Sequence, residues 1–403
     1  MRENNQETSR RFICIIDKSV SAMDYNEEQE CVRLLGFDLE AIDESETVEL
    51  YTFDILSNEF YGVRSQKGNE YVKYFSSRFF TNELFSIISF ELSSEGKSYF
   101  YKSYGNEEPV NISISKIGFQ SYCYPNFKNH VLALSYVNNM TVTYRDVVSI
   151  LHDKKFKLIA YSVGQGMCSL LHDGEIGYLL DAGAGKPVLR GNYQKKLINN
   201  DLQEDIKGLN SLSLILSHLD SDHFRIIRWD EDLLGKIDKI YIPSGVSWLD
   251  SKQKGIAKKV IAIDEINIKS PNLILNGVRT VPKASSSLKN DKEIICHLSL
   301  NNNQSMLYPG DYTYSKMKSD RNSLIPPMTA CKFDFIVVPH HGDHDSQYCI
   351  PSPKCGDSVA FFSAGNHQSW NHPHSESVRE HGIKGFNSLT NKFDPNIVRI
   401  KGY

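Results

Sequence analysis

A buried strand that ends directly in a cluster of metal-binding residue types constrains this fold more than any other feature. The apolar run LSLIL at residues 212–216 is followed at once by SHLDSDH at 217–223, which holds two histidines and two aspartates. Polar residues after a strand are also typical of an ordinary loop. Imidazoles and carboxylates that alternate there can instead converge on one or two cations. Motifs elsewhere in the chain distinguish an ordinary loop from a metal site.

Histidine placement indicates where the chemistry lies. Of the 13 histidines, ten lie from His218 onward, and seven of those ten fall between His340 and His381. Random scatter would rarely concentrate them in this way. We therefore expect the functional site in the C-terminal part of the chain.

Composition narrows the class of protein. At 403 residues the chain is long enough for two domains, and its 23% charged and 40% apolar residues are typical of a soluble globular protein. A formal net charge of −4 argues against a polycation that coats nucleic acid. The eight cysteines include no C-x-x-C pair, which favours reduced thiols over disulfides or a cysteine zinc site. The polar N-terminus and the lack of long apolar runs predict a cytoplasmic protein without a membrane segment.

The sequence of residues 1–152 predicts an accessory domain. Short runs rich in aromatic and β-branched residues predict strands; they lie at residues 11–16, 47–56, 98–104, 111–117 and 130–137. Apolar residues at three- and four-residue spacing predict helices at 26–37 and 144–153. This region contains no catalytic cluster. We expect an α+β domain that offers a surface to a protein partner, although its sequence does not identify what it recognises.

A different pattern begins at residue 153 and continues to 403. Many short apolar runs, each closed by glycine or polar residues, alternate with helical stretches at 230–237 and 251–263. Many strands with a few helices predict two packed sheets flanked by helices. Functional residues that gather at strand ends fit loops carried by a rigid scaffold. We expect this second domain to be the enzyme.

Six short motifs follow one another in this domain: SVGQG (162–166), LLDAG (179–183), SHLDSDH (217–223), YPGD (308–311), VVPHHGD (337–343) and HPH (372–374). Their order resembles the metallo-β-lactamase-fold hydrolases, and most closely the soluble metallohydrolase domain of ComEC-type DNA-uptake competence proteins. The resemblance covers roughly residues 156–385. It implies an α+β fold, the αββα sandwich of that family, preceded here by the accessory domain.

The resemblance also implies a site with two metal ions. His218 and Asp220 are two residues apart, so on an extended segment their side chains point the same way. Asp222 and His223 would then serve a second ion a few ångströms away. Asp311 matches the family's bridging aspartate, and a negative oxygen between two cations offsets their repulsion. An ordinary Pro-Gly-Asp turn is the alternative for that motif.

VVPHHGD ends an apolar strand, and adjacent side chains on a strand face opposite ways. We therefore expect only one of its two histidines to bind metal, His341, while His340 contacts substrate or moves protons; the reverse assignment stays open.

Two further motifs are expected to support the site. Asp181 matches a family aspartate that organises the metal loop by hydrogen bonds. The HPH motif places His372 near the site, where it would hold a phosphate oxygen or protonate a leaving group, with His374 behind it. A turn with two surface histidines is the alternative.

The ligand set of three carboxylates and three imidazoles is oxygen-rich, which moves the preference among divalent ions from zinc towards manganese; zinc stays open. We expect a binuclear metal-dependent phosphodiesterase, a nuclease acting on DNA, with metal-bound hydroxide as the nucleophile and Asp222, His340 and His372 as catalytic residues. One alternative is a hydrolase of a cyclic nucleotide, phosphoester or lactone. Another is a subunit of a multiprotein bacterial system such as phage defence.

Overall fold

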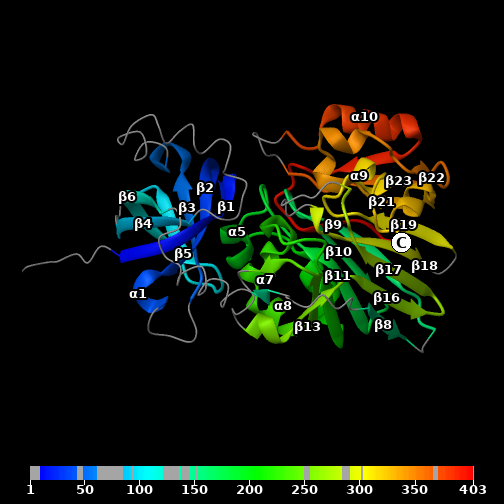
Figure 1. The fold of residues 1–403 in the computed structure, drawn as a ribbon, viewed down its shortest axis with the longest axis horizontal. Helices are drawn as coiled ribbons and strands as arrows, with labels where there is room; N and C mark the ends of the chain where they lie inside the picture. Colours follow the sequence, from blue (N-terminus) through cyan, green and yellow to red (C-terminus); the bar gives the residue numbers. More distant parts are fainter. Residues whose placement is uncertain are drawn as a thin grey trace, which may run out of the picture. The chain divides into compact units, whose positions relative to one another are not determined.

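The computed structural model divides the 403-residue chain into two compact units, residues 1–136 with 249–255 and residues 137–248 with 256–403 (Figure 1). The structure describes residues 10–42, 49–60, 85–92, 95–120, 136–137, 145–150, 153–248, 255–283, 291–300, 303–365 and 371–402.

The first unit is a closed antiparallel barrel of six strands in the order β1-β2-β3-β5-β6-β4. Phe12, Phe53, Phe90 and Phe100 fill its interior, with ring centroids 5.0–5.5 Å apart. The strands are β1 (Arg10–Met23), β2 (Asn26–Asp38), β3 (Tyr51–Leu56), β4 (Phe85–Leu92), β5 (Ser98–Lys102) and β6 (Val110–Gln120); a short helix, α1 (Leu39–Ile42), follows β2.

The helix predicted at residues 26–37 is wrong, because this segment is strand β2. Val32 and Leu34 face the barrel core, while Arg33 between them is also buried and bonds Asp24 and Asp54. Because side chains on both faces of β2 are buried, its sequence does not alternate between apolar and polar residues as a half-buried strand does. Its apolar residues instead fall at three- and four-residue spacing, which is the pattern of a helix. In its described residues the expected α+β unit is therefore a β-barrel, with helical turns only at α1 and residues 57–60.

The second unit contains two large sheets. The seven-stranded sheet has the order β15-β13-β12-β11-β10-β9-β25, and the eight-stranded sheet has the order β24-β23-β21-β19-β18-β17-β16-β8. The first consists of β9 (Lys157–Ser162), β10 (Cys168–His172), β11 (Ile176–Ala182), β12 (Ser211–Ile215), β13 (Ile237–Pro243), β15 (Val260–Ile263) and β25 (Val398–Gly402). The second consists of β8 (Arg145–Ser149), β16 (Glu265–Ser270), β17 (Leu273–Arg279), β18 (Ile294–Leu300), β19 (Gln304–Tyr308), β21 (Phe335–Val337), β23 (Val359–Phe362) and β24 (Asn387–Thr390).

The two sheets face each other across one apolar core, which contains Leu180 and Ile215 of the first sheet and Leu298 and Phe335 of the second. Helices cover the outer faces: α7 and α8 contact β11 and β13, and α9 packs on the other sheet through Met317 (Figure 1). The predicted arrangement of two packed sheets flanked by helices is thus present.

The helices of this unit are α5 (Arg190–Gln194), α6 (Asp201–Lys207), α7 (Arg225–Trp229), α8 (Glu231–Lys236), α9 (Tyr314–Lys318) and α10 (Ser375–Lys384). Short strands are β7 (Tyr136–Val137), β14 (Ser247–Trp248), β20 (Lys332–Phe333) and β22 (Ser352–Pro353).

Two other helix predictions are corrected. In the segment 144–153, residues 145–149 form β8, which pairs in parallel with β16, so these residues belong to this sheet, and the units divide at 136–137. In the segment 251–263, residues 260–263 form β15, parallel to β13, because the run VIAI is buried beside that strand; residues 251–254 lie outside the described residues. Among the described helices, none is long and apolar enough to cross a bilayer.

Candidate metal centre

The candidate site lies where several strands of the two sheets end. Asp181 lies near the end of β11, His218 follows β12, Asp311 follows β19, and the two adjacent histidines follow β21. β11 and β12 are parallel, and so are β19 and β21, so each pair ends at a common sheet edge. Loops at such edges can bring residues from distant parts of the chain together.

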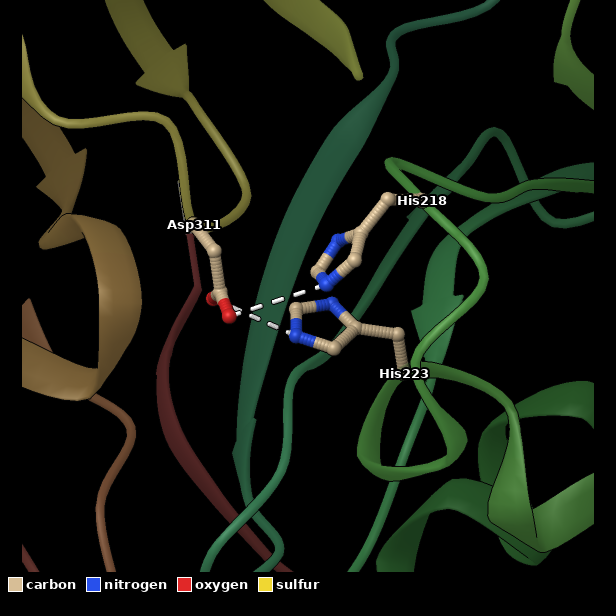
Figure 2. A group of neighbouring side chains, drawn as sticks. All are labelled: His218, His223 and Asp311. Carbon is tan, nitrogen blue, oxygen red and sulfur yellow. Dashed lines mark ion pairs between the residues drawn. The ribbon is translucent and has the colours of Figure 1, made fainter. Parts of the chain in front are cut away.

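Three side chains converge from opposite sides of this site (Figure 2). The Nε2 atoms of His218 and His223 lie 3.6 and 3.2 Å from the carboxylate oxygens of Asp311. All three residues are buried, and the two Nε2 atoms have no hydrogen-bond partner among the described residues. Such nitrogens, facing a carboxylate, are the donor set a divalent cation requires.

A second group of ligand atoms overlaps with the first. It consists of Asp222, His223 and His341, so His223 belongs to both groups. The Nε2 atom of His341 lies 3.4 Å from Asp222 Oδ2 and 3.9 Å from Asp311 Oδ1. Asp220 lies 3.8 Å from His218 Nε2. The structure therefore brings all six expected ligands close together, and five of them form two overlapping groups with the donor set of a metal site.

Asp181 orders the loop that carries the ligands. Its carboxylate accepts hydrogen bonds from the backbone N–H and the hydroxyl of Ser217, both at 2.7 Å, and from Nδ1 of His223, also at 2.7 Å. Tyr308 donates a fourth, at 3.2 Å. Because Nδ1 of His223 carries its proton towards Asp181, the Nε2 lone pair points into the centre.

Glu293 is a residue of the site that sequence reasoning missed. Its Oε2 accepts the backbone N–H of Asp311 at 2.8 Å and lies 3.6 Å from Nδ1 of His218. Burial, and then the neighbouring Asp311 charge, raise the pKa of Glu293 well above its usual value. Gly310, at φ +63°, lets the chain pass so close that a Cβ would overlap with this carboxylate. The only sequence signal was an acid directly before an apolar strand.

The charges of the centre are strongly coupled. Burial lowers the pKa of His223, but the carboxylates of Asp311 and Asp181 outweigh burial and raise it well above its usual value. Burial raises the pKa of Asp311, but the surrounding histidines, His223 first, hold it well below its usual range. A bound cation would take over the role of the histidine proton, so metal binding releases protons here.

His340 and His341 do not lie on a strand, which corrects the basis of their prediction. β21 ends at Val337, and the two histidines turn with φ values of +49° and +57°. Their side chains nevertheless diverge. His341 is buried and donates from Nδ1 to the carbonyl oxygen of Ser363 at 2.8 Å, whereas the His340 side chain is 37% exposed, with Nε2 3.8 Å from Asp311 Oδ2.

These positions predict different losses for the two alanine variants. We expect His341→Ala to bind less metal than the wild type and to lose hydrolysis, because it removes a buried ligand. We expect His340→Ala to keep its metal and to hydrolyse about 10²–10⁴-fold more slowly, as for the loss of an acid–base group. Metal content and turnover measured on both variants check this. Loss of metal in His340→Ala alone would exchange the roles.

The HPH motif divides between the site and its surroundings. The His372 ring lies 5.8 and 5.9 Å from the rings of His340 and His341. Burial, followed by those two histidines, lowers the pKa of His372 to about 3, so it is neutral at pH 7. His374 is half-exposed and contacts Glu376 of α10 at 2.8 Å and the ring of His344 at 5.1 Å.

Glycines allow three loops to interlock beside the metal loop. A Cβ on Gly183 would overlap with the backbone carbonyl oxygen of Asp222, which also accepts the N–H of Met167 at 3.2 Å. A Cβ on Gly185 or Gly365 would overlap with the carbonyl oxygen of Gln165 or Lys186 respectively. The motifs SVGQG and LLDAG therefore provide close backbone contact that fixes the Asp222 main chain.

Comparison with known proteins gives matches among solved structures alone. No protein-family model matches the sequence, and no curated protein sequence matches it. The metallo-β-lactamase fold protein YhfI from Bacillus subtilis is 13% identical, over 59% of this chain and 98% of its own, with a TM-score of 0.36. A possible metal-dependent hydrolase from Veillonella parvula is 10% identical, over 61% and 100%, with a TM-score of 0.35. A metallo-β-lactamase from Cronobacter sakazakii is 13% identical, over 44% and 75%, with a TM-score of 0.29.

Proposed function

We propose that the chain is a binuclear metal-dependent hydrolase with the metallo-β-lactamase sandwich fold, and that its substrates are phosphodiesters of nucleic acid. The observation that carries the proposal is the presence of two neighbouring ligand groups, which together bring three imidazoles and two carboxylates into one buried cluster. Buried imidazole nitrogens that face carboxylates, without hydrogen-bond partners among the described residues, are costly unless a cation satisfies them. Two adjacent cation positions are typical of phosphoester-cleaving sites.

The residues of the site have separable tasks in this proposal. Divalent ions, manganese or zinc, would supply an activated water and neutralise charge on a phosphorus centre. Asp311 belongs to the first ligand group and also lies 3.9 Å from His341 of the second, so its carboxylate would offset the positive charge of both ions. Asp181 and Glu293 hold ligand residues in place through hydrogen bonds. His340, half-exposed at the edge of the centre, is available to substrate. The preference for DNA follows from the motif order shared with competence-type proteins.

A substrate panel tests the proposal. The purified protein is incubated with Mn²⁺ or Zn²⁺ and single-stranded DNA, duplex DNA, RNA, cyclic nucleotides or a lactone, with Asp222→Ala as the inactive control. We expect metal-dependent cleavage of DNA by the wild type and none by the control. Cleavage of only the small substrates would replace the nuclease by a small-molecule hydrolase. A protein that holds no metal after supplementation and cleaves nothing would contradict the hydrolase itself.

A further inference from the structure

Histidines around the centre differ in what their Nδ1 atoms face. Nδ1 of His223 faces the Asp181 carboxylate, and Nδ1 of His341 faces the carbonyl oxygen of Ser363, at 2.7 and 2.8 Å. Nδ1 of His340 faces the Asp343 carboxylate at 2.8 Å. Each of these oxygens only accepts, so each Nδ1 carries the proton and each Nε2 offers a lone pair. His223 and His341 are thereby prepared to bind a cation through Nε2, and His340 to accept a proton there.

His372 is in the opposite situation. Its Nδ1 lies 3.3 Å from the side-chain amide nitrogen of Gln165. The orientation of that amide is fixed at its other end, because Gln165 Oε1 accepts the backbone N–H of Gly365 at 3.2 Å. An amide NH₂ group only donates, so Nδ1 of His372 must accept. A neutral imidazole has one N–H, which is therefore on Nε2.

The reverse orientation of the amide is disfavoured. Rotating the Gln165 side-chain amide by half a turn would place its NH₂ group against the Gly365 N–H, donor against donor. Gln165 is buried, so the unsatisfied donor would cost about 1–3 kcal/mol. The hydrogen-bond network thus assigns both the amide and the ring.

We propose that Gln165 is a positioning residue that holds His372 with its proton on Nε2, so that His372 donates a hydrogen bond to a phosphate oxygen of the substrate and does not bind metal. The ring lies within 6 Å of the rings of His340 and His341, close enough to meet a substrate at the centre. A protonated Nε2 has no lone pair for a cation. The substrate part of this inference rests on the proposed function, whereas the tautomer part does not.

The tautomer is tested directly on the zinc-loaded protein by ¹H–¹⁵N NMR of the histidine rings, with His372→Gln identifying the signals of residue 372. We expect a protonated Nε2 and an unprotonated Nδ1 in the wild type. In Gln165→Glu, a carboxylate oxygen replaces the amide nitrogen, so the proton should move to Nδ1. A wild-type ring protonated on Nδ1, or a Gln165→Glu ring unchanged from the wild type, would overturn the proposal.

Donation to substrate is tested with inorganic phosphate as the probe and with turnover. His372→Ala should keep its full metal content, bind phosphate about 10-fold more weakly, and lose about 10²-fold in kcat, as expected for one lost donor to a developing charge. Gln165→Glu, in which the proton leaves Nε2, should lose the same donor and therefore show a similar weakening of phosphate binding and a similar loss in kcat. Gln347→Met, which changes a glutamine that bonds the carbonyl oxygen of His344, should behave as wild type. Loss of metal in His372→Ala would make it a ligand and overturn the proposal. If the wild type cleaves no phosphodiester and binds no phosphate, the proposed function and the donor role fail, and the NMR result alone decides the tautomer.

Discussion

Replacing His223 by alanine is expected to abolish hydrolysis and to leave less than one metal ion per chain. The reason is that its loss removes a buried ligand and also the His223 bond to Asp181, which orders the loop that carries the other ligands. His218→Ala and His341→Ala each open one group and should retain about one ion. Asp181 also loses one of its buried hydrogen bonds, so the free energy of unfolding should fall by about 1–3 kcal/mol. Elemental analysis, turnover and denaturant unfolding on the purified variants measure the three effects.

His297→Ala is the matched control. His297 lies on β18, half-buried, and bonds the Ser305 hydroxyl at 3.1 Å, away from the ligand cluster. It should keep its metal and its turnover, which separates loss of a ligand from loss of any buried histidine. If His223→Ala retained two ions per chain, the ligand assignment would be wrong.

Gly183→Ala is expected to damage the site without touching a ligand side chain. The new methyl group would overlap with the carbonyl oxygen of Asp222, so the metal loop must shift. We expect metal affinity to fall about 10–100-fold, as is typical when a residue that supports the ligands is changed. The free energy of unfolding should fall by about 1–3 kcal/mol because the added methyl group overpacks the site. Metal titration and denaturant unfolding measure both.

Gly235→Ala provides the comparison for that variant. Gly235 lies in α8, and a methyl group added there would meet no atom of the described residues within 4 Å. Alanine at this position should therefore stabilise the helix by about 0.5–1 kcal/mol. Both variants add one methyl group, so the difference between Gly183→Ala and Gly235→Ala measures the effect of the steric overlap at residue 183. Wild-type metal affinity in Gly183→Ala would show that the loops yield more easily than their packing indicates.

Much of the second unit could be predicted because most of its strands are short apolar runs that can be recognised from the sequence. Apolar runs such as LSLIL are buried on both sides of a sheet, and the polar residues that follow them lie in loops at the strand ends. β2 could not be predicted in this way. Arg33 is buried in the barrel by two carboxylates from other segments, so the polar position that would reveal a strand is itself inside.

The ligands of the site were easier to find than the residues that hold them. Histidines and aspartates at close spacing can be recognised in the sequence as metal ligands. Glu293, in contrast, accepts a backbone N–H 18 positions away, and Gln165 bonds a histidine ring 207 positions away. No local spacing rule connects such partners. The turn at His340 and His341 was equally hidden, because nothing in a pair of histidines indicates two successive residues with positive φ.

The interlocked glycine loops have a consequence for how the protein is made. The Ser363 hydroxyl donates to the carbonyl oxygen of Gly166 at 2.7 Å, and the Gly365 N–H donates to Gln165, 200 positions earlier. A ribosome adds roughly 5–20 residues per second, so about 10–40 s separate synthesis of the two sides of this contact. During that interval the loop that carries Asp222 lacks its closing partners. We therefore expect a growing chain to remain catalytically silent until residue 365 has emerged, so that the proposed hydrolysis would begin only after most of the chain has been translated.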